Sequence, residues 1–249
     1  MRRLLALATP AALALVGCAA PGPKIGPPPD PFLATRPPRQ VTALPPPPPR
    51  VQAPQGRPGL PTATPLRGRT IVIDPGHGGK DPGARGRSRI PEKTINLEIG
   101  RELAARLRSL GARVYMTRDA DQFIELEDRA ALADRVRCDL FISIHADSSP
   151  RASASGLTAY IARGTGGQSL RAADSIGAAL RGAGLEFRGV RGAGFKVLLH
   201  SRPAILMECG YLTNGAEAAR LATNGHRTQI AAAIADGLAV HFGGVAAGR

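Results

Sequence analysis

Four residues of this 249-residue chain could together bind a metal ion and move a proton: His77, Glu92, His145 and Glu208. Two imidazole nitrogens and one carboxylate oxygen form a ligand set that zinc takes in catalytic sites, where a fourth position is left to water. Bound zinc lowers the pKa of that water to about 7, and a further carboxylate must then take the proton and pass it to a leaving nitrogen. Glu208 follows an apolar stretch, where a carboxylate is costly unless it faces a cleft, so we assign it this catalytic role.

Each of these residues also has a simpler explanation when it is taken alone. His77 could be a loop residue after a Pro-Gly turn, and Glu92 could be an acid that favours a helix N-terminus. His145 could be a hydrogen-bonded core histidine, and Glu208 could pair with a buried arginine. The spacings of 15 and 53 residues between the expected ligands match no short zinc motif such as His-Glu-x-x-His. Spacing alone therefore leaves the metal and the structural interpretations both open.

The surrounding sequence predicts that three of these residues meet at one edge of a sheet. A short run of apolar β-formers leads into a Pro-Gly turn with His77 at its tip, and similar runs end at His145 and Glu208. Such strands alternate with helical patterns along residues 67–249, which predicts a single three-layer α/β domain with a mostly parallel sheet and helices on both faces. Functional groups of such folds collect beyond the carboxyl ends of the strands, and this is where these three side chains would lie.

The rest of the pattern predicts the elements that complete the domain. The Gly/Arg-rich stretch 182–194 is expected to be a loop. Helices are expected at 91–110, 125–136 (with Leu126 facing inward), 167–181, 214–221 and 226–242, and further strands at 113–117, 157–161 and 195–198.

Several side chains outside the site have expected local roles. Arg118 is expected to pair with Asp119 at the end of a strand. Cys138 and Cys209 are expected to be buried thiols rather than a disulfide. Asn214 is expected to cap a helix, with an acid at the capping-box position three residues later. The remaining histidines are expected at the surface: His200, His226 and His241.

The N-terminal residues predict an exported protein. Met1-Arg2-Arg3 precedes an apolar run that is too short to span a bilayer and is typical of a signal-peptide core. The run ends in Leu15-Val16-Gly17-Cys18, which resembles the lipobox of bacterial lipoproteins. We therefore expect residues 1–18 to be a signal peptide, and Cys18 to carry a lipid anchor that holds a periplasmic protein at the outer membrane. An ordinary cleaved secretion signal is the alternative.

Residues 19–66 have the composition of a linker. They contain 17 of the 23 prolines and cannot bury a core, so we expect a disordered, Pro-rich tether, with a disordered tail of no role as the alternative. Of the net charge of +14, residues 1–18 carry +2 and the linker +4, which leaves +8 on residues 67–249. That domain lacks a helix-turn-helix signal and an aromatic stacking platform. The charge therefore favours an anionic cell-wall polymer or membrane surface over nucleic acid.

Five stretches of the domain, taken together, resemble a known family. Over roughly residues 69 to 242 the chain is similar to the zinc-dependent N-acetylmuramoyl-L-alanine amidases of the Amidase_3 type. The stretches stand in family order: Ile71 to Gly79, Glu92-Lys93 with Asn96-Leu97, Thr117-Arg118, Ser143 to Asp147, and Glu208 to Asn214.

The resemblance implies a site and an activity. It implies that His77, Glu92 and His145 bind one Zn²⁺ and that Glu208 is the catalytic acid/base. It also implies that the substrate is peptidoglycan, cut at the amide between N-acetylmuramic acid and the L-alanine of the stem peptide. A non-catalytic peptidoglycan-binding module and a zinc peptidase that cuts within the stem peptide remain as alternatives.

The chain departs from the family pattern at a few positions. Cys209 and Asp134 stand where the family more often has Thr or another small residue and Asn, respectively, and neither change touches the proposed chemistry. Some family members that act in cell division carry an inhibitory helix after the second histidine. Only about 60 residues separate His145 from Glu208 here, and ordinary elements account for them. We therefore expect no inhibitory helix and no required protein activator.

Overall fold

The computed structural model describes residues 64–84, 86–87 and 90–243. The expected signal peptide with Cys18 and the tether up to residue 63 lie outside the described residues. Leu66, which the sequence analysis places in the tether, is fully buried, and its N–H donates to the carbonyl of Leu110 at 3.1 Å. The packed domain therefore already includes this residue. Among the helices of residues 64–243 that the structure describes, none combines the length and the apolar character needed to span a bilayer.

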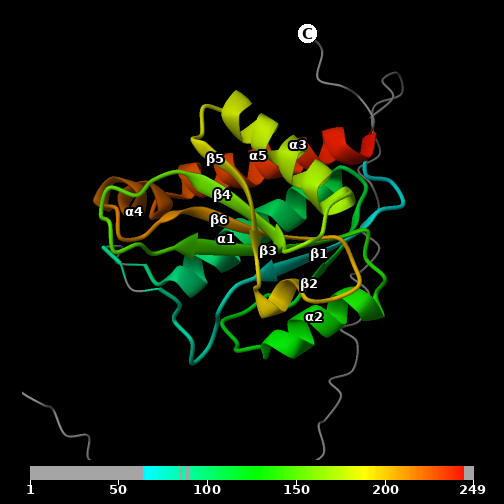
Figure 1. Cartoon of the computed structure of the whole chain (residues 1–249), viewed down its shortest axis with the longest axis horizontal. Coiled ribbons are helices and arrows are strands. Elements are labelled where there is room, and N and C mark those ends of the chain that lie inside the picture. Colours follow the sequence, from blue (N-terminus) through cyan, green and yellow to red (C-terminus); the bar gives the residue numbers. More distant parts are fainter. Residues whose placement is uncertain (1–63, 85, 88–89, 244–249) are drawn as a thin grey trace, which may run out of the picture. The chain divides into compact units, whose positions relative to one another are not determined.

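Six strands form one sheet in the order β2-β1-β3-β6-β4-β5 (Figure 1). All neighbouring strands are parallel except β4 and β6, which are antiparallel. The expected α/β fold with a mostly parallel sheet is thus confirmed. The strands are β1 (Thr70–Pro75), β2 (Arg113–Met116), β3 (Leu140–Asp147), β4 (Leu157–Ala162), β5 (Phe187–Ala193) and β6 (Ala204–Tyr211). The helices are α1 (Glu92–Ser109), α2 (Leu126–Arg135), α3 (Gln168–Gly182), η1 (Lys196–Leu198, a 3₁₀ turn), α4 (Gly215–Leu221) and α5 (Asn224–Gly243).

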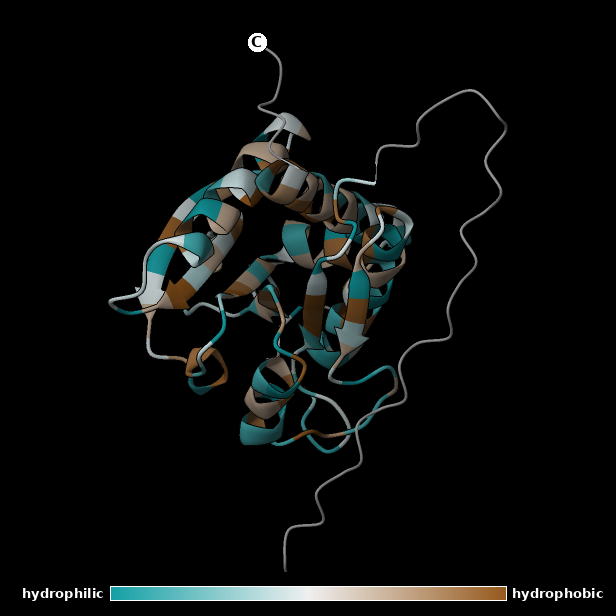
Figure 2. Cartoon of the chain, turned by 90° about the vertical axis from the view of Figure 1, so that its right-hand side faces the viewer, coloured by the Kyte–Doolittle hydropathy of each residue, from teal (hydrophilic) through white to brown (hydrophobic). Residues whose placement is uncertain are grey.

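Helices cover both faces of the sheet and produce two apolar clusters. Helices α1, α3 and α5 pack on one face over the larger cluster, whereas α2 and η1 lie on the other face (Figure 1). Hydrophobic segments run along the strands between these layers (Figure 2). Strand β3 contributes Ile142 and Ile144 to the larger cluster and Phe141 to the smaller one. Its unbroken apolar run therefore reflects burial on both faces, as expected for a central parallel strand.

Helix α1 positions the carboxylate of Glu92 by packing firmly on the sheet. Ile95, Ile99 and Leu103 are spaced at helical period, and all three are fully buried. The helix ends before Gly111, whose φ of 96° a residue with a Cβ rarely adopts. Glu92 is the first residue of the helix, so its side chain lies at the end that faces the sheet edge.

Two elements differ from the sequence-based expectation. Residues 187–193 form the edge strand β5 rather than part of a loop. The error arose because glycines and exposed arginines interrupt the apolar alternation there. Residues 196–198 form η1 rather than a strand, and Val197 and Leu198 reach the smaller cluster from this turn. A short apolar run does not distinguish a strand from a buried turn by itself.

Three local expectations are also wrong. Leu126 is 46% exposed rather than directed inward. Asp119 pairs with Arg101, whereas Arg118 is fully buried and bonds to backbone carbonyls. His200 is half-buried against the ring of Phe141 rather than a free surface residue. The expectation of buried, unbonded thiols at the two cysteines of the domain is confirmed.

Candidate active site

His77 is held at the tip of β1 by a short, tightly bonded loop. Its φ of 62° lies in the left-handed region, which costs energy for a non-glycine residue and is typical of functional sites. Gly78 and Asp81 exchange two backbone hydrogen bonds of 3.0 and 3.1 Å. Nδ1 of His77 lies 2.7 Å from Oδ2 of Asp81, so its other nitrogen, Nε2, faces the interior of the site.

Glu92 is buried between the two histidines. Its Oε2 lies 3.1 Å from Nε2 of His77, and its Oε1 lies 3.2 Å from Nδ1 of His145. The backbone N–H groups of Ala84 and Ala146 donate to the same two oxygens, at 2.6 and 3.1 Å. Burial raises the pKa of Glu92, but the hydrogen bonds from the two histidines outweigh this effect and hold its pKa far below the usual range. The carboxylate is therefore ionised, as a metal ligand must be.

His145 comes from β3 and completes the group. Its ring lies 4.9 Å from the ring of His77, and the two rings are nearly perpendicular. One potential ligand atom from each of His77, Glu92 and His145 lies within 4.8 Å of the other two. A Cβ at Gly76 would lie 2.2 Å from the ring of His145, so this position requires glycine. The donor set and its burial suit a zinc ion.

Glu208 lies on β6 directly opposite His145 in the strand register. It is 9% exposed, and no described group forms a hydrogen bond with its Oε2. Burial, together with the negative charges of Asp147 and Glu92, raises the pKa of Glu208 well above its ordinary value. The structure therefore places beside the three-residue group a carboxyl side chain that resists ionisation in the absence of a cation.

Two buried arginines that the sequence analysis did not assign to the site shape its walls. Arg118 donates to the carbonyls of Gly76 and Lys93 at 2.8 and 2.7 Å, which connects the end of β1 to the start of α1. Arg129 donates to the carbonyl of His77 at 2.7 Å and to the carboxylate of Asp74 at 2.9 Å. The motif Thr117-Arg118 indicated a role for the first arginine, but no signal in the sequence indicated the second.

Replacing Asp74 by alanine should destabilise the domain strongly. Asp74 and Arg129 are 1% and 3% exposed, and loss of the carboxylate leaves a buried guanidinium without its counter-charge. We expect the free energy of unfolding to fall by about 3–5 kcal/mol in urea titrations. Asp119→Ala breaks the exposed pair with Arg101 and should cost at most about 1 kcal/mol. Equal losses in the two variants would contradict this assignment.

Asp81, which the sequence analysis did not single out, should support metal binding through His77. A carboxylate that accepts from the outer nitrogen of a ligating histidine fixes its tautomer, and loss of such a group weakens metal affinity by about 10- to 100-fold. We expect this loss of zinc affinity in Asp81→Asn, measured by competition with a chromophoric chelator. Asp236→Asn, at an exposed position on α5, is the control. An unchanged affinity in Asp81→Asn would show that Asp81 has no such role.

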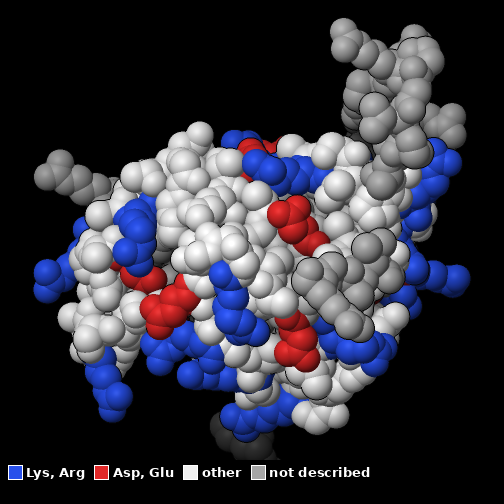
Figure 3. Space-filling view, turned by 90° about the horizontal axis from the view of Figure 1, so that it is seen from above, with Lys and Arg blue, Asp and Glu red and all other residues white. Residues whose placement is uncertain are grey.

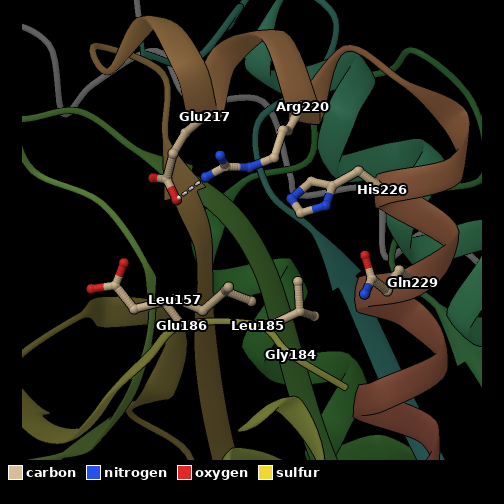
Figure 4. A pocket seen from close by; sticks show the side chains of 8 residues that line it. All are labelled: Leu157, Gly184, Leu185, Glu186, Glu217, Arg220, His226 and Gln229. Carbon is tan, nitrogen blue, oxygen red and sulfur yellow. Dashed lines mark hydrogen bonds and ion pairs between the residues drawn. The ribbon is translucent and has the colours of Figure 1, made fainter. Parts of the chain in front are cut away.

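A separate pocket lies near the starts of β4 and α5 (Figure 4). The carboxylate of Glu217 borders it and accepts from the N–H groups of Gly156 and Tyr211 at 2.9 and 2.7 Å. Asn214 caps α4 as expected, but Glu217 bonds to these strand ends instead of completing the capping box. The pocket contains none of the three candidate ligands. It is lined by Leu157, Gly184, Leu185, Glu186, Glu217, Arg220, His226 and Gln229.

The face over α3 and α5 carries basic and acidic side chains interspersed (Figure 3). The positive charge of the domain is thus not gathered there into one continuous patch. This distribution gives no support to an extended basic surface for nucleic acid on that face.

Fold and site together define the class: an α/β domain with a candidate His-Glu-His metal site at the carboxyl edge of a mostly parallel sheet. The family model for N-acetylmuramoyl-L-alanine amidase matches residues 71–240, and the chain belongs to this family.

One curated relative and two solved structures agree with this family assignment. The chain is 37% identical over 186 residues to the probable cell wall amidase LytH of Staphylococcus saprophyticus. This alignment covers 73% of this chain and 61% of that relative. It thus spans about three fifths of the length of LytH. The amidase of Clostridium difficile 630 superposes with a TM-score of 0.66 at 32% identity, over 68% of this chain and 94% of that chain. AmiC2 of Nostoc punctiforme gives a TM-score of 0.64 at 40% identity, with the same two coverages.

Proposed function

We propose that this chain is a zinc-dependent peptidoglycan amidase that hydrolyses the bond between N-acetylmuramic acid and the L-alanine of the stem peptide. His77, Glu92 and His145 would hold the single zinc ion, and Glu208 would transfer the proton. The main support is that these candidate ligand atoms converge within 4.8 Å in a member of the amidase family. The register of β3 and β6, which puts Glu208 beside His145, supports its role.

Zinc, when bound, would supply a water of lowered pKa and polarise the scissile carbonyl. Glu208 accepts a proton from the attacking water as the new C–O bond forms. It then donates that proton to the nitrogen as the C–N bond breaks, so that the amine leaves neutral. The buried position of Glu208 suits both steps, because a raised pKa makes the ionised carboxylate a stronger base toward the attacking water and lets the carboxyl group keep the proton until the C–N bond breaks.

Product analysis separates this proposal from its two alternatives. Purified peptidoglycan is incubated with the full chain, either with zinc or with a chelator, and the soluble products are identified by mass spectrometry. We expect free stem peptides that begin at L-alanine, and only when metal is present. Shortened peptides still attached to muramic acid would identify a peptidase instead. A protein that pellets with the wall and releases nothing would identify a binding module.

The N-terminal sequence supports a proposal about where this activity takes place. We propose that the protein is exported to the periplasm and held at the outer membrane through a lipid on Cys18, with the Pro-rich segment as a tether to the peptidoglycan. The stretch between His145 and Glu208 holds two strands, one long helix and one 3₁₀ turn, all of which belong to the fold. We therefore propose that activity needs no protein activator, and a strict requirement for a second protein in the assay would contradict this.

A further inference from the structure

The two strands beyond β6 bring their first residues, rather than their last, to the edge of the sheet that holds the candidate site (Figure 1). Strand β4 runs antiparallel to β6, and its second residue, Thr158, pairs with Glu208 near the end of β6. Strand β5 runs parallel to β4, and its first residue, Phe187, pairs with Leu157 at the start of β4. The next residue of β5 is Arg188, so this arginine lies at the same edge of the sheet as Glu208.

Arg188 also projects from the same face of the sheet as Glu208. Met207 and Cys209 belong to the larger apolar cluster, so Glu208 between them projects from the opposite face. Phe187 packs against the same cluster, so Arg188 next to it projects away from that cluster as well. The backbones at the two positions are two strands apart, which corresponds to about 10 Å at the usual spacing of neighbouring strands.

The side chain of Arg188 is held across the start of β4. Its Nη1 donates to the carbonyl of Ser155 at 2.7 Å, and its guanidinium carbon lies 6.0 Å from the centre of the ring of Tyr211. Its aliphatic part lies over Gly156, where an added Cβ would be 3.1 Å from the Cγ of Arg188 and 2.8 Å from the carboxyl carbon of Glu186. Glycine at this position therefore leaves room for the arginine, and the ring of Tyr211 gives the guanidinium a surface to rest on.

This guanidinium keeps most of its donors free for a ligand. Arg188 is exposed, and among the residues that the structure describes its one hydrogen-bond acceptor is the carbonyl of Ser155. Within the same described part of the chain, no carboxylate forms an ion pair with it. Glu186, the acid two residues before it, accepts from the hydroxyl of Ser155 at 3.0 Å instead. A guanidinium has five N–H donors in a planar fork, and such a fork binds a carboxylate through two parallel hydrogen bonds.

The separation between Glu208 and Arg188 suits a peptide that runs from the candidate zinc site across the ends of β6 and β4. An extended peptide advances about 3.3–3.6 Å per residue, so about three to four residues beyond the scissile bond reach the arginine. A stem peptide of that length ends there. Its last residue carries a free carboxylate unless that end has been joined in a crosslink.

We infer that Arg188 binds the terminal carboxylate of the stem peptide and thereby makes the enzyme prefer peptides with a free end. This role rests on the proposed amidase function. The contact lies far from the reacting bond and is equally strong before and during the reaction, so it lowers KM and leaves kcat unchanged. A crosslinked stem peptide lacks this carboxylate and would be cleaved less efficiently.

Paired substrates and three variants of the full chain test this inference. The two probes are an N-acetylmuramoyl tetrapeptide with a terminal carboxylate and the same compound with a terminal carboxamide. Arg188→Gln removes the charge, and Arg188→Lys keeps the charge but loses the planar fork. Arg191→Gln, the control, removes another exposed arginine further along β5. Each protein is assayed with zinc for kcat and KM on both probes, and for thermal unfolding.

We expect the wild type to prefer the carboxylate probe by about tenfold in kcat/KM, with the difference in KM. Arg188→Gln should cleave both probes equally well, at the wild-type rate for the carboxamide. Arg188→Lys should keep part of the preference and Arg191→Gln all of it. A wild type without preference, or a preference that survives in Arg188→Gln, would overturn the inference. So would an equal loss on both probes in that variant, because this pattern indicates a structural role.

A binding measurement separates failure of this inference from failure of the proposed function. The two probes are titrated by calorimetry into Glu208→Gln and into the double variant Glu208→Gln with Arg188→Gln, so no turnover is needed. Tighter binding of the carboxylate probe that is lost with Arg188 supports the inference even if the wild type hydrolyses neither probe, in which case the proposed function alone is overturned. Equal binding of the two probes to Glu208→Gln, or no binding, would overturn the inference even in an active enzyme.

Discussion

Replacing Glu208 by glutamine should lower kcat on peptidoglycan by about 10²- to 10⁴-fold and leave zinc bound at one ion per chain. The amide has the shape of the carboxyl group but cannot accept the proton of the attacking water. Glu208 donates no ligand atom to the His-Glu-His group, so metal binding should persist. Measured turnover together with zinc analysis of the same sample checks both parts. Retained turnover in this variant would refute the assigned role.

The same variant gives an independent check on the burial of Glu208. Folding of the metal-free protein raises the pKa of this carboxyl group. At a pH above the ordinary pKa of a carboxyl group, the unfolded chain has therefore lost a proton that the folded protein retains. Stability must then fall as pH rises from about 4.5 through the folded pKa. Glutamine removes this dependence. The free energy of unfolding of the metal-free wild type should therefore decrease with rising pH more than that of Glu208→Gln. If the unfolding free energies of the two proteins changed equally with pH, the raised pKa of Glu208 would be contradicted.

The sequence pointed to the three residues of the candidate metal group because they stand at recognisable positions. Two apolar runs lead into His77 and His145, and the proline at position 91 marks the helix start that places Glu92. Parallel strands bring their carboxyl ends to one edge of the sheet. His77 and His145 could therefore be predicted to lie at the same edge without knowledge of the strand order. Spacing alone left the metal and the structural interpretations open, and the family resemblance then favoured the metal interpretation.

The supporting residues could not be found in the same way. Thr158 faces Glu208 because β4 runs antiparallel to β6. The residue pattern of one strand does not indicate whether that strand runs parallel or antiparallel to its neighbour. Arg129 reaches Asp74 from a helix 55 residues away, which is a long-range contact without local signature. Arg118 was assigned to its sequence neighbour, whereas a buried guanidinium with five donors is better satisfied by several carbonyls.

Replacing His145 by glutamine should abolish zinc binding and, with it, amidase turnover. Removal of one of three protein ligands leaves two, which is fewer than a catalytic zinc site uses. The wild type should also gain thermal stability with added zinc, by about 2.7 kcal/mol at a hundredfold excess over Kd, because the metal binds the folded state. This gain should vanish in His145→Gln.

His241→Gln is the matched control, because His241 lies near the end of α5 with its ring against Phe242 and outside the candidate site. It should bind one zinc ion and keep its turnover. A zinc-induced rise in stability that survives in His145→Gln would show that the metal binds elsewhere on the chain. Loss of the rise in both variants would show that the assay reports general histidine binding rather than this site. Only loss confined to His145→Gln assigns the metal to the group in which Glu92 joins the ends of β1 and β3.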